Sequence, residues 1–74
     1  MKQLINFVEV NGKEYMVSTT DTFDMGLETM VFESRNGKVT KWFGLYVNHY
    51  DTIDEAIKGH EEVVNFLENL EKYI

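Results

Sequence analysis

The stretch from residue 50 onward constrains the fold more than any other, because it carries a complete helix-start signal followed by an apolar stripe. Thr52 stands where an N-cap residue is expected, and Glu55 follows three residues later, which is the spacing of a capping box. Asp54 in the first turn suits the positive end of the helix dipole. The sequence therefore predicts one long helix over residues 53–73, with Thr52 and Glu55 as structural residues that fix its start.

At helical spacing, one face of this segment is mostly apolar. The stripe consists of Ile53, Ala56, Ile57, His60, Val64, Leu67 and Ile74, and it is flanked beyond residue 62 by Val63, Phe66, Leu70 and Tyr73. We expect His60, in the middle of the stripe, to be a core histidine that bonds a backbone carbonyl or a strand side chain. Gly59 costs a helix about 1 kcal/mol relative to alanine. We therefore expect a strand or an aromatic ring, for which Trp42 is a candidate, to approach the helix closely at Gly59.

The predicted helix is longer than the strands that precede it. A helix of this length extends about 31 Å, whereas a seven-residue strand spans about 23 Å. We therefore expect the last two turns to overhang the sheet and to present four apolar residues to a protein partner. These residues are Phe66, Leu70, Tyr73 and Ile74.

Near the N-terminus, Asn11-Gly12 between two alternating segments is a strong hairpin signal, because both residues tolerate the positive φ of a two-residue type I′ turn. This turn sets the register of strands 3–10 and 13–19. Glu9 then lies opposite Glu14, and two like charges are tolerable only on a face exposed to water. The other face, with Leu4, Val8, Tyr15 and Val17, is expected to contact the helix. Ile5, Phe7 and Met16 share the water-exposed face and form a second apolar patch.

The middle of the chain predicts a third strand over residues 27–33 and a turn at Asn36-Gly37. Two alternatives remain for residues 39–50. The whole segment forms one returning strand with a bulge at Gly44, or residues 39–44 are an irregular connection and only residues 45–50 pair with the third strand. We favour the second alternative, in which Trp42 packs over an open edge of the core. The predicted class is α+β: one domain over residues 1–74, with an antiparallel sheet of three or four strands and a C-terminal helix on one face.

Composition narrows the classes of function. A chain of 74 residues with 43% apolar and 14% aromatic residues can form one small core. It has no cysteine, which excludes disulfides and thiolate metal sites, and a formal net charge of −6, which disfavours binding to nucleic-acid phosphates. No apolar run is long enough for a membrane span or a signal peptide. We expect a cytoplasmic protein without membrane association.

Few residues suggest catalysis or metal binding. His60, His49 and Asp51 together have the chemistry of a metal site, but their spacing matches no ligand motif. Asp21, Asp24 and Glu28 lack the order of a calcium loop. Ser18 and Ser34 lack the context of an activated nucleophile, and no glycine-rich phosphate loop is present. We expect no enzyme activity, no catalytic or metal site and no cofactor.

The aromatic group Trp42, Phe43, Tyr46 and Tyr50 points instead to protein binding. Alternation along a strand cannot bury all four on one face, so one or two must reach the surface. Exposed aromatic residues surrounded by charge are typical anchors of protein interfaces. Trp42 therefore joins Ile5, Phe7, Met16 and the helix end as an interface candidate.

Three segments carry a resemblance to a group of small proteins. Residues 28–32 read Glu-Thr-Met-Val-Phe, residues 50–52 read Tyr-Asp-Thr, and Glu55-Ala56 and Gly59-His60 follow. Over roughly residues 27–65 the chain resembles small proteins encoded by bacteriophages and prophages of Gram-positive bacteria, a group with no established activity. The resemblance implies a phage accessory protein in a bacterial cytoplasm. The sheet followed by a Tyr-Asp-Thr…Glu-Ala helix start is also similar to plant AP2-type DNA-binding domains, but their sheets are rich in arginine and this one is not.

These observations favour a non-enzymatic phage accessory protein that binds protein, either a second copy of itself as a homodimer or a host factor that it inhibits. The alternative function is a nucleic-acid-associated regulator that uses the sheet face. Its basic and aromatic residues would be Arg35, Lys38, Lys41 and Trp42.

Overall fold

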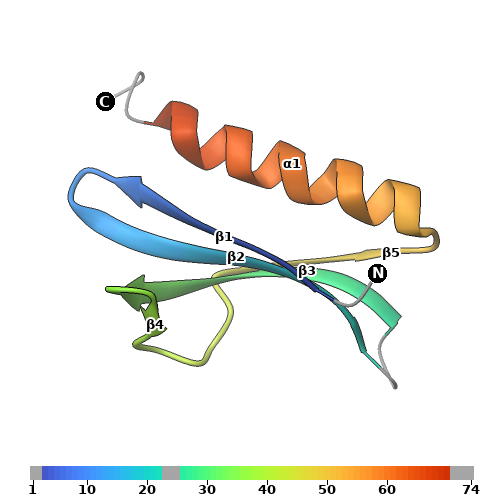
Figure 1. Ribbon diagram of the computed structural model, residues 1–74, viewed down its shortest axis with the longest axis horizontal. Helices are drawn as coiled ribbons and strands as arrows, with labels where there is room; N and C mark the ends of the chain where they lie inside the picture. The colour runs from blue at the N-terminus through green and yellow to red at the C-terminus, as the bar shows by residue number, and fades with distance from the viewer. Residues whose placement is uncertain (1–2, 23–25, 71–74) are drawn as a thin grey trace.

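The computed structural model describes residues 3–22 and 26–70, which form an α+β fold with one helix packed on an antiparallel sheet (Figure 1). The predicted class is therefore confirmed. The strands are β1 (Gln3–Val10), β2 (Lys13–Thr22), β3 (Gly26–Arg35), β4 (Lys38–Val39) and β5 (Tyr46–Tyr50), and the helix is α1 (Ile53–Asn69).

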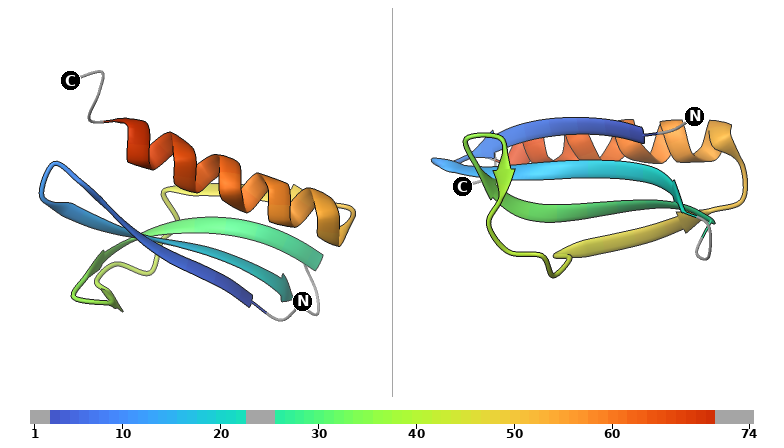
Figure 2. Two further views of the ribbon diagram at one scale, coloured as in Figure 1. Left: turned by 45° about the horizontal axis from the view of Figure 1, so that its top comes forward. Right: turned by 60° about the horizontal axis from the view of Figure 1, so that its bottom comes forward.

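The sheet has two different edges. Strand β1 pairs with β2, and β2 pairs with β3, so β1 is the edge strand on one side. The far side of β3 is shared: β4 pairs with Ser34 and Arg35 at one end, and β5 pairs with residues 27–31 at the other. The right-hand view of Figure 2 shows this arrangement, with the helix behind β1 and β2 and with β5 at the opposite edge.

The N-terminal hairpin has the predicted register. Val8 pairs with Tyr15, Phe7 with Met16 and Glu9 with Glu14, as the two-residue turn requires. The turn residues Asn11 and Gly12 have φ values of 51° and 82°, which is the left-handed region that asparagine and glycine tolerate best. The face that carries Val8 and Val17 packs against the helix, also as predicted. Turn chemistry alone therefore fixed the alignment of β1 and β2.

The helix begins as predicted but presents a different face to the sheet. The Thr52 hydroxyl accepts a hydrogen bond from the Glu55 amide at 3.1 Å and donates one to the Glu55 carboxylate at 2.9 Å. The buried helical residues are Ala56, Gly59 and His60. Ile53 and Ile57, predicted to lie in the buried stripe, are 45% and 38% exposed. The helix is rotated about its axis so that Gly59, and not the two isoleucines, faces the sheet.

The predicted overhang is wrong for Leu70. This residue is half-buried and, with Val63, Val64 and Leu67, packs against a core of four strand valines, Val8, Val10, Val17 and Val31. The strands are longer than predicted: β2 and β3 have 10 residues each, whereas α1 has 17. Such strands extend about 33 Å and such a helix about 26 Å, so the sheet supports the whole helix. Tyr73 and Ile74, the other two predicted residues at the helix end, lie outside the described residues.

For residues 39–50 the favoured alternative is confirmed, with one addition. The segment at 46–50 pairs with β3 as predicted, and residues 40–45 form no strand. The addition is β4, which extends the Asn36-Gly37 turn into a short hairpin. Trp42 packs against Phe32 with ring centroids 5.5 Å apart, although 75% of its surface stays exposed. Phe32 pairs with Met16, so Trp42 lies on the sheet face that is turned away from the helix.

Candidate functional site

The helix is not centred on the sheet, and this offset creates a groove. Helix α1 packs chiefly against β1 and β2, less against β3, and less again against β5. The floor of the sheet over β3 and β5 is therefore partly uncovered, which leaves a groove of about 820 Å³. This volume falls within the range of ligand pockets, about 300–1,000 Å³. We call it the α1–β5 groove.

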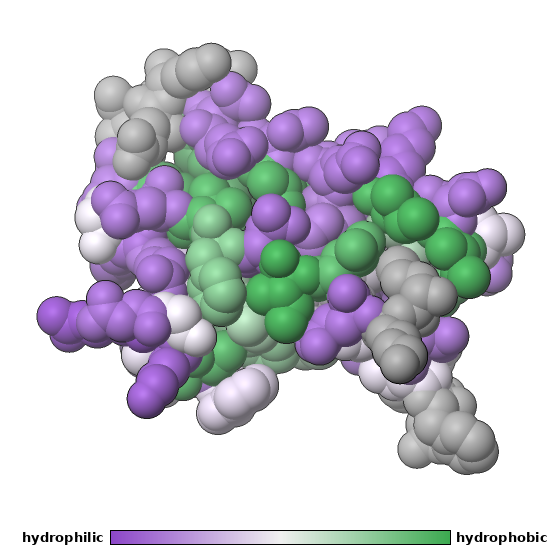
Figure 3. Space-filling view, viewed as in Figure 1, coloured by the Kyte–Doolittle hydropathy of each residue, from purple (hydrophilic) through white to green (hydrophobic). Residues whose placement is uncertain are grey.

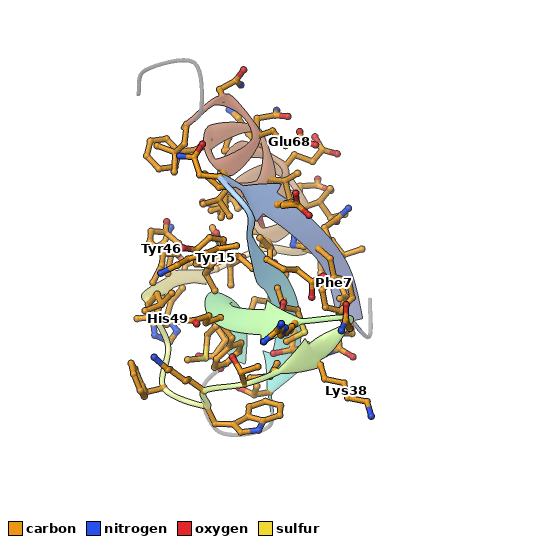
Figure 4. All side chains as sticks on the ribbon, turned by 90° about the vertical axis from the view of Figure 1, so that its left-hand side faces the viewer. Phe7, Tyr15, Lys38, Tyr46, His49 and Glu68 are labelled. Atoms are coloured by element: carbon orange, nitrogen blue, oxygen red, sulfur yellow. The ribbon has the colours of Figure 1, made fainter. Side chains whose placement is uncertain are left out.

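The floor of the groove follows from strand alternation and its wall from helical spacing. Tyr15, Val31 and Tyr46 are register neighbours or near neighbours on the helix-facing side of β2, β3 and β5, and all three line the groove. Figure 4 shows Tyr15 and Tyr46 close together beneath the helix, on the side away from Phe7. The helical wall includes Gly59, Val63, Phe66 and Leu70. The floor and the wall are mainly apolar and aromatic.

Tyr50 lines this groove, and its ring lies against Gly59. A Cβ atom at position 59 would fall on the Tyr50 hydroxyl and ring carbons. The prediction that an aromatic ring approaches Gly59 is therefore confirmed, but the ring belongs to Tyr50 and not to Trp42. Trp42 lies on the other face of the sheet, against Phe32. The absence of a side chain at Gly59 is what lets the tyrosine ring lie between the helix and β5.

The groove offers few polar groups. The Tyr50 hydroxyl is buried and has no hydrogen-bond partner within residues 3–22 and 26–70. Asn48 also lines the groove, and Glu55, Lys58 and Glu62 lie along the helical rim. An apolar floor with charges at the rim is the usual composition of a protein-binding surface, whose centre is poor in charge.

His60 belongs to a chain of hydrogen bonds that joins three strands to the helix and is buried except at its Asn6 end. Its Nε2 lies 2.7 Å from the Asn6 amide oxygen, and its Nδ1 lies 2.7 Å from the Thr19 hydroxyl. The Thr19 and Thr29 hydroxyls are 2.5 Å apart. For a neutral ring, Nε2–H donates to Asn6, Thr19 donates to Nδ1 and Thr29 donates to Thr19. The predicted core histidine bonded to strand side chains is confirmed.

Burial lowers the pKa of His60 below its ordinary value of 6.5, partly opposed by the charge of Glu61. The native state therefore favours the neutral ring. The contribution of the neutral ring to stability is complete well above pH 6.5 and is lost progressively as the pH falls through 6.5 towards the lowered pKa. We expect the free energy of unfolding, measured by urea titration, to fall between about pH 7.5 and pH 5.5. The decline should be shallower in His60→Gln, because the glutamine amide does not titrate in this range. A wild-type decline no steeper than that of His60→Gln would contradict this assignment.

The interface residues predicted from the sequence are not gathered into one surface. Ile5 and Phe7, 44% and 46% exposed, lie with half-buried Met16 on the face away from the helix. Phe66 is 65% exposed and lines the groove. Leu70 also lines the groove, but from the core side of the helix. Tyr15, Val31, Tyr46 and Tyr50 were missed as groove residues. The alternation of Tyr46, Asn48 and Tyr50 indicated a shared face, but not that the helix leaves that face uncovered.

The histidine–aspartate combination considered for a metal is not assembled. His60 is on the helix-facing side, whereas His49 pairs with Glu28 on the other side of the sheet, its Nδ1 3.7 Å from the Glu28 carboxylate. Among the described residues, no group of three histidine or carboxylate side chains is close enough to hold an ion. Of the acids considered for calcium, Asp24 lies outside the described residues.

The basic residues of the nucleic-acid hypothesis lie at the β3–β4 end of the sheet. Lys41 is 3.7 Å from the Glu33 carboxylate, and the Glu14 carboxylate accepts hydrogen bonds from the Ser34 hydroxyl and the Gly37 amide close by. These carboxylates offset much of the positive charge of Arg35, Lys38 and Lys41. The arrangement gives this surface no strong attraction for phosphate.

Comparisons of the chain with family models, with curated protein sequences and with solved structures give no match. Within residues 3–22 and 26–70, no helix has the length and apolar character needed to cross a membrane.

Proposed function

We propose that this protein is a non-enzymatic binding module whose α1–β5 groove receives an apolar segment of a protein partner. The observation that carries the proposal is the position of Phe66, which is 65% exposed at the lip of an apolar groove. Exposed aromatic side chains beside a desolvated pocket are the residues that most often dominate protein-binding energies. The uncovered tyrosines of the floor supply further contact area of the same kind.

The proposed partner is a host protein, and the proposed role is that of a phage accessory protein that modulates it in the bacterial cytoplasm. The support for this context is the resemblance of residues 27–65 to small phage and prophage proteins. The net charge of −6 supports a partner whose contact surface is basic around an apolar centre. Glu55 and Glu62 at the rim of the groove would face such basic residues.

A matched pair of helix variants tests the groove. Phe66→Ser and Ile57→Ser each replace one exposed apolar side chain of α1 with serine, but Ile57 does not line the groove. In pull-downs from a Gram-positive host lysate, we expect wild type and Ile57→Ser to capture the same host protein and Phe66→Ser to lose it. With that protein purified, titration calorimetry should show Kd raised about 30-fold or more by Phe66→Ser.

Two results would contradict the proposal. One is equal capture by all three proteins, which would place the binding surface elsewhere. The other is the absence of any host protein that wild type retains and Phe66→Ser does not. Circular dichroism of the two variants serves as the control for folding, since neither residue is buried.

A further inference from the structure

Strand β1 is an unprotected sheet edge. Its eight residues pair with β2 in one uninterrupted register, and within the described part of the chain no strand pairs with its outer side. Natural edge strands are commonly shielded by lysine, proline or a bulge. Residues 3–10 contain no lysine, proline or glycine, and Glu9 is their one charged residue. Figure 3, which presents this edge, shows apolar surface on and below β1 and a second apolar area at the start of the helix.

We propose that β1 pairs antiparallel with β1 of a second copy, about a two-fold axis at Asn6, so that two sheets become one continuous sheet. This interface lies on the other flank of the helix from the α1–β5 groove and does not depend on it. An edge strand directs half of its backbone N–H and C=O groups outward, and pairing with an identical strand satisfies them on both copies.

The sequence of β1 selects this register. With the axis at Asn6, Ile5 lies opposite Phe7 of the second copy on one face. Leu4 lies opposite Val8 on the other face, and Glu9 lies opposite Gln3. Moving the axis to Ile5 would place Phe7 opposite Gln3, and moving it to Phe7 would place Ile5 opposite Glu9. Of these three registers, the Asn6-centred one matches apolar with apolar on both faces and separates the like charges.

The helix supplies a second layer of the same interface. His60 contacts Asn6, so the middle of α1 lies over the proposed axis. Ile57 and half-buried Val64 fall on the flank of the helix beyond His60, opposite to Phe66. An antiparallel second helix brings Ile57 alongside Val64 of the other copy. The exposure of Ile53 and Ile57 is then explained, because both lie where the second helix arrives.

Disulfide trapping tests the register directly, because the chain has no cysteine of its own. Ile5→Cys and Phe7→Cys are prepared separately and mixed under mild oxidation. We expect a disulfide-linked heterodimer, because positions 5 and 7 face each other across the axis, and little homodimer, because identical positions are more than about 7 Å apart. Dominant homodimers of either variant would overturn the Asn6-centred register. As a control, each variant is also mixed with Asp51→Cys, whose cysteine is exposed and lies outside the interface. If positions 5 and 7 give no more heterodimer than this control, the proposed interface is wrong.

Sedimentation of charged variants tests the interface without a covalent bond. We expect wild type to dimerise, Ile5→Lys/Phe7→Lys to weaken the dimer, and Ile5→Lys/Phe7→Glu to bind at least about tenfold more tightly than the double-lysine variant. The two variants differ only in the sign of the charge at position 7. Phe66→Ser should leave the dimer unchanged, which separates this interface from the groove. Wild type that stays monomeric up to its solubility limit, or equal behaviour of the two charged variants, would overturn the proposal.

Discussion

Replacing Gly59 with alanine is expected to destabilise the protein by about 2 kcal/mol, although the same change at an open helical position stabilises a helix by about 1 kcal/mol. The sign is reversed because the new Cβ would fall on the hydroxyl and ring of Tyr50. The tyrosine is held between β5 and the helix, so it cannot move away without leaving a cavity. Urea denaturation followed by circular dichroism measures the change.

The control for this prediction removes the ring. In a Tyr50→Val background, Gly59→Ala should be neutral or stabilising, because the space that the ring occupied is free. A loss of stability from Gly59→Ala that is the same in both backgrounds would show that the close approach of Tyr50 is not the reason for glycine at this position.

The second large effect is expected for Thr19→Val, which should cost about 3 kcal/mol although the two side chains have nearly the same shape. Thr19 is fully buried, and its hydroxyl contacts both the Thr29 hydroxyl and Nδ1 of His60. Valine would leave both of these buried polar groups without their partner. The midpoint of urea unfolding is the measurement, and Thr20→Val, at a half-buried position of the same strand, is the control, with an expected change below about 0.5 kcal/mol.

A double variant checks the reason for this loss. His60→Leu in the Thr19→Val background removes the orphaned ring nitrogen, so the double variant should be more stable than the sum of the two single losses predicts. Strict additivity of the two changes would mean that Thr19 and His60 do not act through a shared hydrogen bond.

Local chemistry explains which parts of the fold could be predicted from the sequence. The Asn11-Gly12 turn fixes the alignment of β1 and β2, and the Thr52–Glu55 pair fixes the start of α1. Each signal depends on residues within a few positions of one another. The opposition of Glu9 and Glu14 then identified the solvent-facing side of the hairpin, so the core face was also predictable.

The rotation of the helix was not predictable in the same way. Helical spacing alone predicts a buried stripe that includes Ile53 and Ile57, because it takes no account of the volume that the Tyr50 ring occupies beside Gly59. That ring belongs to another element, so its effect is tertiary and leaves no periodic signal in the helix. The predicted overhang failed for a related reason, because propensity placed the ends of β2 and β3 too early.

The candidate site could be predicted only in part. The exposure of Phe66 was predicted, but from an overhang of the helix that the structure does not have. The need for a close contact at Gly59 followed from the cost of glycine in a helix. The floor of Tyr15, Val31 and Tyr46 did not, because these residues come from three strands and form a groove only where the helix is absent. The position of a helix across a sheet depends on the summed packing of both faces, which no short segment encodes.

The hydrogen-bond chain from Thr29 through Thr19 and His60 to Asn6 has a consequence for the uniqueness of the fold. A helix that rests on valines alone could slide by one turn and still bury similar apolar area, since such contacts are not directional. The polar chain opposes such a shift, because the displaced groups of Thr19, Thr29 and His60 are buried and would be left without a partner. These four side chains therefore fix the position of the helix along the sheet. Substitutions among the surrounding valines should change the stability of the fold more readily than they change the alignment of the helix.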